Sequence, residues 1–196
     1  MARPREFDME QTLDAALSTF WTQGYEATSM ADIMEVTGLH KGSLYKAFDD
    51  KHDLFMKALT RYLEGAWVMT QATLTEVESP LNGLRAWLQG VIYLCCDQPI
   101  QRGCMAMNAA IELGPHDPEV STLLMSHHQR VSALLTETIA NGQQAGEIRD
   151  DLTPEQLSKA LFVFSAGLLG TSKVLSGVIE TGEMVAAFLK CMSPPA

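Results

Sequence analysis

One short segment carries the donors and cations of this chain that are best spaced to bind an anion. Its sequence reads Lys41-Gly42-Ser43-Leu44-Tyr45-Lys46. On a helix, with about 100° between successive residues, Leu44 lies on one side while Tyr45 and Lys46 lie around the other. The polar side has little bulk at Gly42 and Ser43, so a groove wall can approach closely. Such a helix suits contact with the phosphates and base edges of DNA.

The thiol of Cys104 is a second candidate for chemistry. It follows Arg102-Gly103 and falls in the first turn of a predicted helix, where the helix dipole lowers the pKa of a thiol. One hypothesis is that Cys104 senses electrophiles or oxidants by covalent modification. The plainer interpretation is an ordinary buried cysteine, and the sequence leaves both open.

Other reactive constellations are missing from the sequence. It has no phosphate-cradling glycine-rich loop, no GxSxG and no HExxH motif. The four cysteines show no CxxC spacing, and the adjacent His127 and His128 diverge by about 100° on a helix, so they do not easily share a metal. We predict no enzyme activity, no metal site and no cofactor.

Two short helices joined by a tight turn must position the basic segment. Ser29 is a natural N-cap, and Asp32 three positions later completes a capping box. Gly38 can adopt the left-handed conformation that closes the first helix, and the second begins near His40. The pattern predicts a helix-turn-helix with its second helix in the major groove, rather than a hairpin that only looks like one. The apolar stripe of the first helix is Met30, Ile33 and Met34.

These residues resemble the DNA-binding domain of the TetR family of bacterial transcriptional regulators, over roughly the first third of the chain. His40 departs from the pattern, since the family usually has Ser or a similar N-cap there. The resemblance rests on Gly24-Tyr25, Ala27-Thr28-Ser29, Asp32-Ile33, Gly38, Lys41-Gly42-Ser43-Leu44-Tyr45 and Phe48.

Because the cysteines suggest no disulfide framework, we expect a cytoplasmic protein with reduced thiols. The resemblance implies a transcriptional regulator; repression is the expected role, and the sequence leaves activation open. The regulator would bind double-stranded, pseudo-palindromic operator DNA as a homodimer, with recognition helices about 34–36 Å apart, and a small-molecule effector would release it. We expect His127 at the seam between the two protomers and His128 in solvent. The predicted DNA-binding residues are Ser29, Met30, Lys41, Gly42, Ser43, Tyr45, Lys46 and Lys51.

Within a ligand-responsive family, a group of aromatic, sulfur-containing and amide side chains suggests an adaptable apolar pocket. For each residue taken singly, a place in the core is the simpler interpretation. As a group, some of them are expected to line an effector cavity. The predicted ligand-binding residues are Trp67, Trp87, Cys104, Met107, Asn108 and Phe164, with Met105 a further member of the group.

Apolar periodicity and capping residues predict helices throughout the chain. The fold class is all-α, with an N-terminal three-helix helix-turn-helix head and a C-terminal helical bundle domain that dimerises. The head is assigned to 1–62, with its motif at 29–48 and a linking helix at 50–70, and the effector and dimerisation domain to 63–196. The remaining helices are expected at about 8–23, 80–96, 102–113, 117–145, 154–178 and 184–192.

Charge is unevenly distributed along the chain. The net charge is −10, yet Lys41, Lys46 and Lys51 gather around the second motif helix, and Arg3 and Arg5 form a basic arm. The arm is either a frayed terminus or a minor-groove contact. A local basic patch on an acidic body should limit non-specific binding and make operator binding salt-sensitive.

No signal peptide or membrane span is expected, because the apolar run 160–172 is shorter than the roughly 20 residues that a span requires. Two alternative functions remain open from the sequence. One is a helical enzyme, which no visible reactive pair supports. The other is a helical interaction module that has lost DNA binding, which the intact basic face of the segment 41–46 disfavours.

Overall fold

The computed structural model of the chain describes residues 8–75, 77–96, 102–175 and 180–194, so Arg3 and Arg5 of the predicted arm lie outside the described residues. Within these ranges the chain forms nine α-helices and no strand, which confirms the all-α class. Most helix ends agree with the sequence expectations to within a few residues, and the end expected near 178 lies outside the described residues. The helices are α1 (Met9–Gln23), α2 (Met30–Thr37), α3 (Lys41–Ala47), α4 (Lys51–Leu74), α5 (Pro80–Cys96), α6 (Met105–Glu112), α7 (Pro118–Gln144), α8 (Pro154–Leu175) and α9 (Thr181–Met192).

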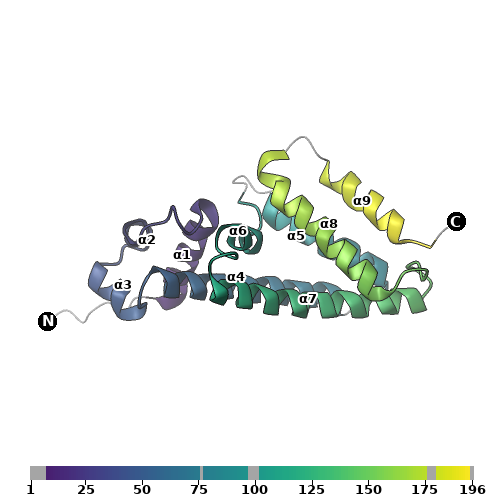
Figure 1. Cartoon of the computed structure of the whole chain (residues 1–196), viewed down its shortest axis with the longest axis horizontal. Helices are drawn as coiled ribbons and strands as arrows, with labels where there is room; N and C mark the ends of the chain where they lie inside the picture. The colour runs from purple at the N-terminus through teal and green to yellow at the C-terminus, as the bar shows by residue number, and fades with distance from the viewer. Residues whose placement is uncertain (1–7, 76, 97–101, 176–179, 195–196) are drawn as a thin grey trace.

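The molecule is elongated, with α1 to α3 at one end (Figure 1). Helices α4 and α7 pack along each other and run from this head to the far end, while α5, α8 and α9 pack over the far half. The short α6 lies between the head and the body and contacts α4, α7 and α8. The linking helix α4 is therefore a single rod of 24 residues, longer than the predicted 50–70 segment.

Two clusters of buried apolar side chains form the core. The body cluster is built from α5, α7, α8 and α9, with the end of α4. The head cluster surrounds Phe20, Ile33 and Leu44, and it also takes in Met105 and Ala109 of α6. Because apolar packing continues from the head into α6, a displacement of α6 changes the packing of the head core. The division at 62/63 stays a prediction, and it falls in the middle of α4.

Helix α6 buries a different face from the one that its apolar spacing predicts. The spacing places Ile111 on one face with Cys104 and Met107. In the structure Met105 and Ala109 are buried, whereas Ile111 is 70% exposed. Cys104 is the N-cap of α6, so the helix begins three residues after the expected start at about 102, and Cys104 precedes the first turn in which it was expected. No helix in the described ranges is both long and apolar enough to cross a membrane.

Candidate functional site

The first helix of the motif is held by reciprocal hydrogen bonds at its start. The Asp32 N–H donates to Ser29 Oγ at 3.2 Å, and the Ser29 N–H donates to Asp32 Oδ2 at 2.7 Å. Gly38 ends the helix in the left-handed conformation, with φ 66°. The predicted capping box and C-cap are both confirmed, and together they fix the turn that aims α3.

Helix α3 divides its residues between the core and an exposed surface. Leu44 and the following Phe48 are buried, and they anchor the helix to the head core. Lys41, Tyr45 and Lys46 are exposed, and the Lys41 ammonium lies 5.7 Å from the centre of the Tyr45 ring. We call Lys41, Gly42, Tyr45 and Lys46 the α3 surface. His40, which departs from the family pattern, makes no side-chain cap at the start of α3.

The motif is open to close approach at the first turn of α3 and, in part, at the start of α2. A Cβ built on Gly42 would meet no atom within 4 Å, so the backbone of the first turn of α3 is open. Ser43 is only half-buried beside it. At the start of α2, Ser29 is exposed, whereas Met30 is half-buried against the head core and offers less surface.

Lys51 is held inside the head. Its ammonium donates to the carbonyl oxygens of Tyr25 at 3.0 Å and Thr28 at 3.1 Å, and it lies 4.1 Å from the centre of the Tyr25 ring. These contacts tie α4 to the turn between α1 and α2. The structure thus gives Lys51 a positioning role, and the basic patch expected from the sequence is reduced to Lys41 and Lys46 among the described residues.

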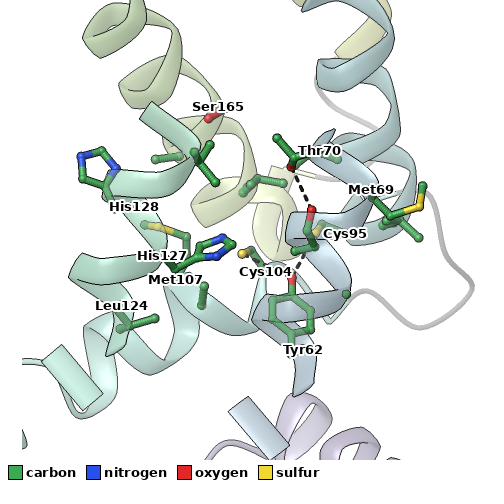
Figure 2. A pocket seen from close by; sticks show the side chains of 18 of the residues that line it. Tyr62, Met69, Thr70, Cys95, Cys104, Met107, Leu124, His127, His128 and Ser165 are labelled. Atoms are coloured by element: carbon green, nitrogen blue, oxygen red, sulfur yellow. Dashed lines mark hydrogen bonds between the residues drawn. The ribbon is translucent and has the colours of Figure 1, made fainter. Parts of the chain in front are cut away.

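A cavity of about 720 Å³ lies in the body next to the head (Figure 2). Side chains from α1, α4, α5, α6, α7 and α8 line it, and most are apolar, which is typical of small-molecule sites. Three predicted ligand-binding residues, Trp87, Cys104 and Met107, are among them. The sequence did not predict the other lining residues as ligand-binding; they include Trp21, Tyr62, Met69, Leu94, Cys95, Leu124 and His127.

The other predicted ligand-binding residues lie outside the cavity lining. The guanidinium of Arg130 stacks on the ring of Trp67, 4.6 Å from its centre. The Asn108 amide donates to the Arg102 carbonyl at 3.0 Å, and the Phe164 ring stacks on Phe188 at 4.1 Å. Met105, the further member of the group, is buried in the head core. Residue type identified these side chains, but helix rotation decides which of them face the cavity.

Two thiols and a phenol meet in the cavity wall. The Tyr62 hydroxyl lies 3.5 Å from the Cys104 sulfur, to which it donates, and 3.9 Å from the Cys95 sulfur. Hydrogen bonds from Cys95 first, and then from Tyr62 and the backbone N–H groups that start α6, lower the pKa of Cys104 to about 6. The Cys104 thiolate is therefore stabilised at neutral pH, although burial opposes it.

The expected place of His127 at the seam between protomers stays a prediction, whereas His128 is half-buried and does not stand free in solvent as expected. Both line the cavity, and Figure 2 shows the His127 ring turned toward Cys104 and Met107. Burial, and then the positive charge of Arg130, lowers the pKa of His127, so its imidazole is neutral at pH 7. Its buried Nδ1 has no hydrogen-bond partner among the described residues. The His128 ring packs 4.2 Å from Phe162 instead of standing in solvent.

Polar contacts join the cavity wall to the head on both sides of α6. Before the helix, the Gly103 carbonyl accepts a hydrogen bond from the Trp21 indole N–H at 2.7 Å. At its end, the Glu112 carboxylate accepts from the backbone N–H groups of Tyr25 at 3.0 Å and Glu26 at 2.8 Å. Sequence reasoning missed these contacts, because the paired residues lie more than 80 positions apart.

A third polar contact lies beyond α6. His52 of α4 pairs at 2.7 Å with Asp117, the N-cap of α7. Hydrogen bonds from backbone N–H groups of α7 and from His52 lower the pKa of Asp117, so the carboxylate stays ionised at neutral pH. Together with the contacts of α6, it makes the head and the cavity wall one connected structure.

The structure joins a helix-turn-helix head, which carries the exposed polar α3 surface, to a helical body with an apolar cavity. This combination defines the class of one-component DNA-binding regulators. Two family descriptions match the chain: "Bacterial regulatory proteins, tetR family" over residues 13–58 and "Tetracyclin repressor-like, C-terminal domain" over residues 80–188. The chain therefore belongs to the TetR family of bacterial transcriptional regulators.

Named relatives agree with this assignment. The transcriptional repressor ComR of Escherichia coli strain K12 is 32% identical over 147 residues, 74% of this chain and 70% of that protein. The crystal structure of E. coli NemR in its reduced form superposes with a TM-score of 0.83 at 19% identity, covering 95% and 97% of the two chains. A cysteine mutant of the TetR-family transcriptional regulator CifR, in complex with 26-base-pair double-stranded operator DNA, gives a TM-score of 0.79 at 26% identity, covering 96% and 97%. The chain is thus a transcriptional regulator and not an enzyme.

Proposed function

We propose that this protein is a cytoplasmic, ligand-responsive repressor that binds a pseudo-palindromic operator as a homodimer and leaves it when a small effector fills the cavity. The observation that carries the proposal is the double role of α6, whose side chains line the cavity while Gly103 and Glu112 at its two ends hydrogen-bond to the head. An effector that displaces α6 therefore changes the position of α3. Its influence is limited to the difference in its affinity for the two head positions.

The cavity indicates the chemistry of the effector. Its lining is mainly apolar, so most of the ligand must be apolar as well. The neutral His127 ring lines the cavity and can take part in one hydrogen bond with a ligand, as donor or acceptor according to the tautomer. A compact apolar molecule with one hydroxyl or carbonyl group matches both features, because that group could hydrogen-bond to the His127 imidazole.

On the DNA side, the α3 surface is assigned to the major groove. Tyr45 and Lys46 are assigned to phosphates, Lys41, Gly42 and Ser43 to the groove, and Ser29 with Met30 to the adjoining backbone. The contacts of Lys51 with Tyr25 and Thr28 support a positioning role for this residue, so it is not proposed as a DNA contact.

The first test is binding of the purified protein to the DNA upstream of its own gene across a series of salt concentrations. We expect tight binding that weakens steeply with salt, and a slope smaller by about one per lost phosphate contact in Lys46→Ala. Lys190→Ala, an exposed lysine of α9, is the matched control and should behave as wild type. Failure to bind any fragment in a genome-wide selection would contradict the proposal.

A second candidate function is sensing of electrophiles through Cys104. The specific observation in its favour is a thiol with a lowered pKa that faces an apolar cavity next to the contact between Gly103 and the head. A thiolate is the nucleophilic form of cysteine, so a reagent that enters the cavity would be attacked there.

The pH dependence of alkylation tests this second candidate. Because the pKa is lowered to about 6, the rate of reaction of Cys104 with iodoacetamide should stay high at pH 7 and fall only as the pH drops below about 6. Tyr62→Phe removes one donor and should move the midpoint of the profile to higher pH. Operator release by iodoacetamide that persists unchanged in Cys104→Ser would sink the idea.

A further inference from the structure

The wall of the cavity brings together two cysteines from different helices. Cys95 lies near the end of α5, and Cys104 caps the start of α6. Both sulfurs contact the hydroxyl of Tyr62, at 3.9 Å and 3.5 Å, and the two thiols are hydrogen-bonded to each other. Figure 2 shows the three side chains on one wall of the cavity. Two sulfurs in this contact need to move little to bind the same atom.

We propose that Cys95 and Cys104 together form a two-thiol site for a thiophilic ligand that bridges both sulfurs, namely an organic trivalent arsenical. Soft thiolate ligands are the donors that thiophilic centres select. The apolar lining, which includes Met69, Leu94 and Val131, accommodates the organic substituent. The chemistry deepens the proposed function by naming a ligand class, and only its consequence for DNA binding rests on that function.

The reaction with phenylarsine oxide is balanced without any oxidant or reductant. Two arsenic–sulfur bonds form and the bonds between arsenic and oxygen break. The oxygen leaves as water, with the proton of the Cys95 thiol and one proton from solvent, because Cys104 reacts as a thiolate. Arsenic remains trivalent and both sulfurs keep their oxidation state. The stabilised Cys104 thiolate attacks first, and the Cys95 thiol then closes the ring, with the Tyr62 hydroxyl beside both sulfurs throughout.

Bridging the two sulfurs also has a mechanical consequence. It fastens the start of α6 to α5 and removes the thiolate to which the Tyr62 hydroxyl donates. Gly103, which precedes Cys104, holds the indole of Trp21 in the head through its carbonyl. The arsenical should therefore alter the contact between head and body and lower the affinity for operator DNA.

The experiment is a titration of the reduced full-length protein with phenylarsine oxide, followed by intact mass and by the number of thiols left. We expect one phenylarsenic bridge per protomer, the loss of two thiols, and reversal by a small dithiol but not by an equal concentration of monothiol. Cys95→Ser and Cys104→Ser should each weaken binding by about 100-fold or more, because the second bond is intramolecular. Cys96→Ser and Cys191→Ser are the matched controls and should bind as wild type.

Several outcomes would overturn the site. Equal affinity in wild type and Cys95→Ser would mean that a single thiol is sufficient. Loss of bridging in Cys96→Ser alone would show that Cys95 and Cys104 are the wrong pair. Cys95→Ala repeats the test without placing a hydroxyl in the apolar wall, and circular dichroism of each variant verifies the fold. Mass and thiol counts do not depend on DNA, so a bridged protein with unchanged operator affinity supports the site and contradicts only its regulatory consequence.

Discussion

Single side chains on α3 serve either the core or the exposed surface. Leu44 is fully buried, whereas the neighbouring Tyr45 is 43% exposed. The Lys41 ammonium lies 5.7 Å from the centre of the Tyr45 ring, and the exposed tyrosine can donate its hydroxyl to an acceptor such as phosphate. A change at that oxygen should therefore affect DNA binding without affecting the core.

We predict that Tyr45→Phe weakens operator binding by about tenfold, because a hydrogen bond to a charged acceptor contributes about 1.5 kcal/mol or more. The loss should be similar for operator and unrelated DNA, since phosphate contacts carry no sequence information. Fluorescence anisotropy with both DNAs measures it, and thermal unfolding should be unchanged. Tyr93→Phe, at a tyrosine of the body that is 61% exposed, is the control. A loss confined to operator DNA would assign Tyr45 to a base instead.

How far the sequence predicts these residues depends on how local their contacts are. The capping box of Ser29 and Asp32, the left-handed Gly38 and the amphipathic α3 are properties of neighbours in sequence, and all were predicted correctly. Half of the six predicted ligand-binding residues line the cavity, and most of the lining was not predicted, because the rotation of each helix is set by packing against distant parts of the chain. The contacts of Glu112 were missed entirely, since they join segments that only the folded chain brings together.

Among the elements, α6 has the largest mechanical role for its length. Each oxygen of the Glu112 carboxylate accepts one backbone N–H from the turn after α1. A Cβ on Gly24 would come within 3.0 Å of the same carboxylate, and Gly24 has a φ of +89°, so this approach requires glycine. The end of α6 is therefore fitted closely to the head.

We predict that Glu112→Ala lowers the free energy of unfolding by about 1–2 kcal/mol, because two backbone donors lose a charged acceptor. Hydrogen exchange of the Tyr25 and Glu26 amides should accelerate by about tenfold, while the amides of α2 keep their protection. Glu112→Gln, which retains a single acceptor oxygen, should fall in between. Glu183→Ala, an exposed glutamate of α9, is the control, and unchanged exchange at Tyr25 in Glu112→Ala would rule out this contact.

At the scale of the whole molecule, α8 presents an apolar face that the single chain leaves exposed. Val163 is 68% exposed and Val174 is 81% exposed on this face. Gly167 and Gly170 lie between them, and a Cβ at either would meet open space. Small and apolar residues at helical spacing permit close packing of two copies around a two-fold axis, which supports the proposed homodimer.

We predict that Val163→Arg raises the dimer dissociation constant by about 100-fold or more, because burying an unpaired charge in each protomer costs at least about 3 kcal/mol. Tight operator binding should be lost with it. Val68→Arg, at a valine of α4 that is 60% exposed, is the matched control and should remain dimeric. Sedimentation equilibrium decides the matter, and a dimer of unchanged strength in Val163→Arg would remove α8 from the interface.

The positions of the tryptophans make intrinsic fluorescence a reporter of what occupies the cavity. The chain has three indoles, of which Trp21 and Trp87 border the cavity, while Trp67 lies beneath Arg130 outside it. Indole emission depends on the polarity of its surroundings, so a molecule that fills the cavity changes the light from two of the three fluorophores. Trp21 also reports on the head, because its N–H holds Gly103. In the Trp67→Phe variant, compound collections can be screened against unlabelled protein by the shift in tryptophan emission wavelength alone.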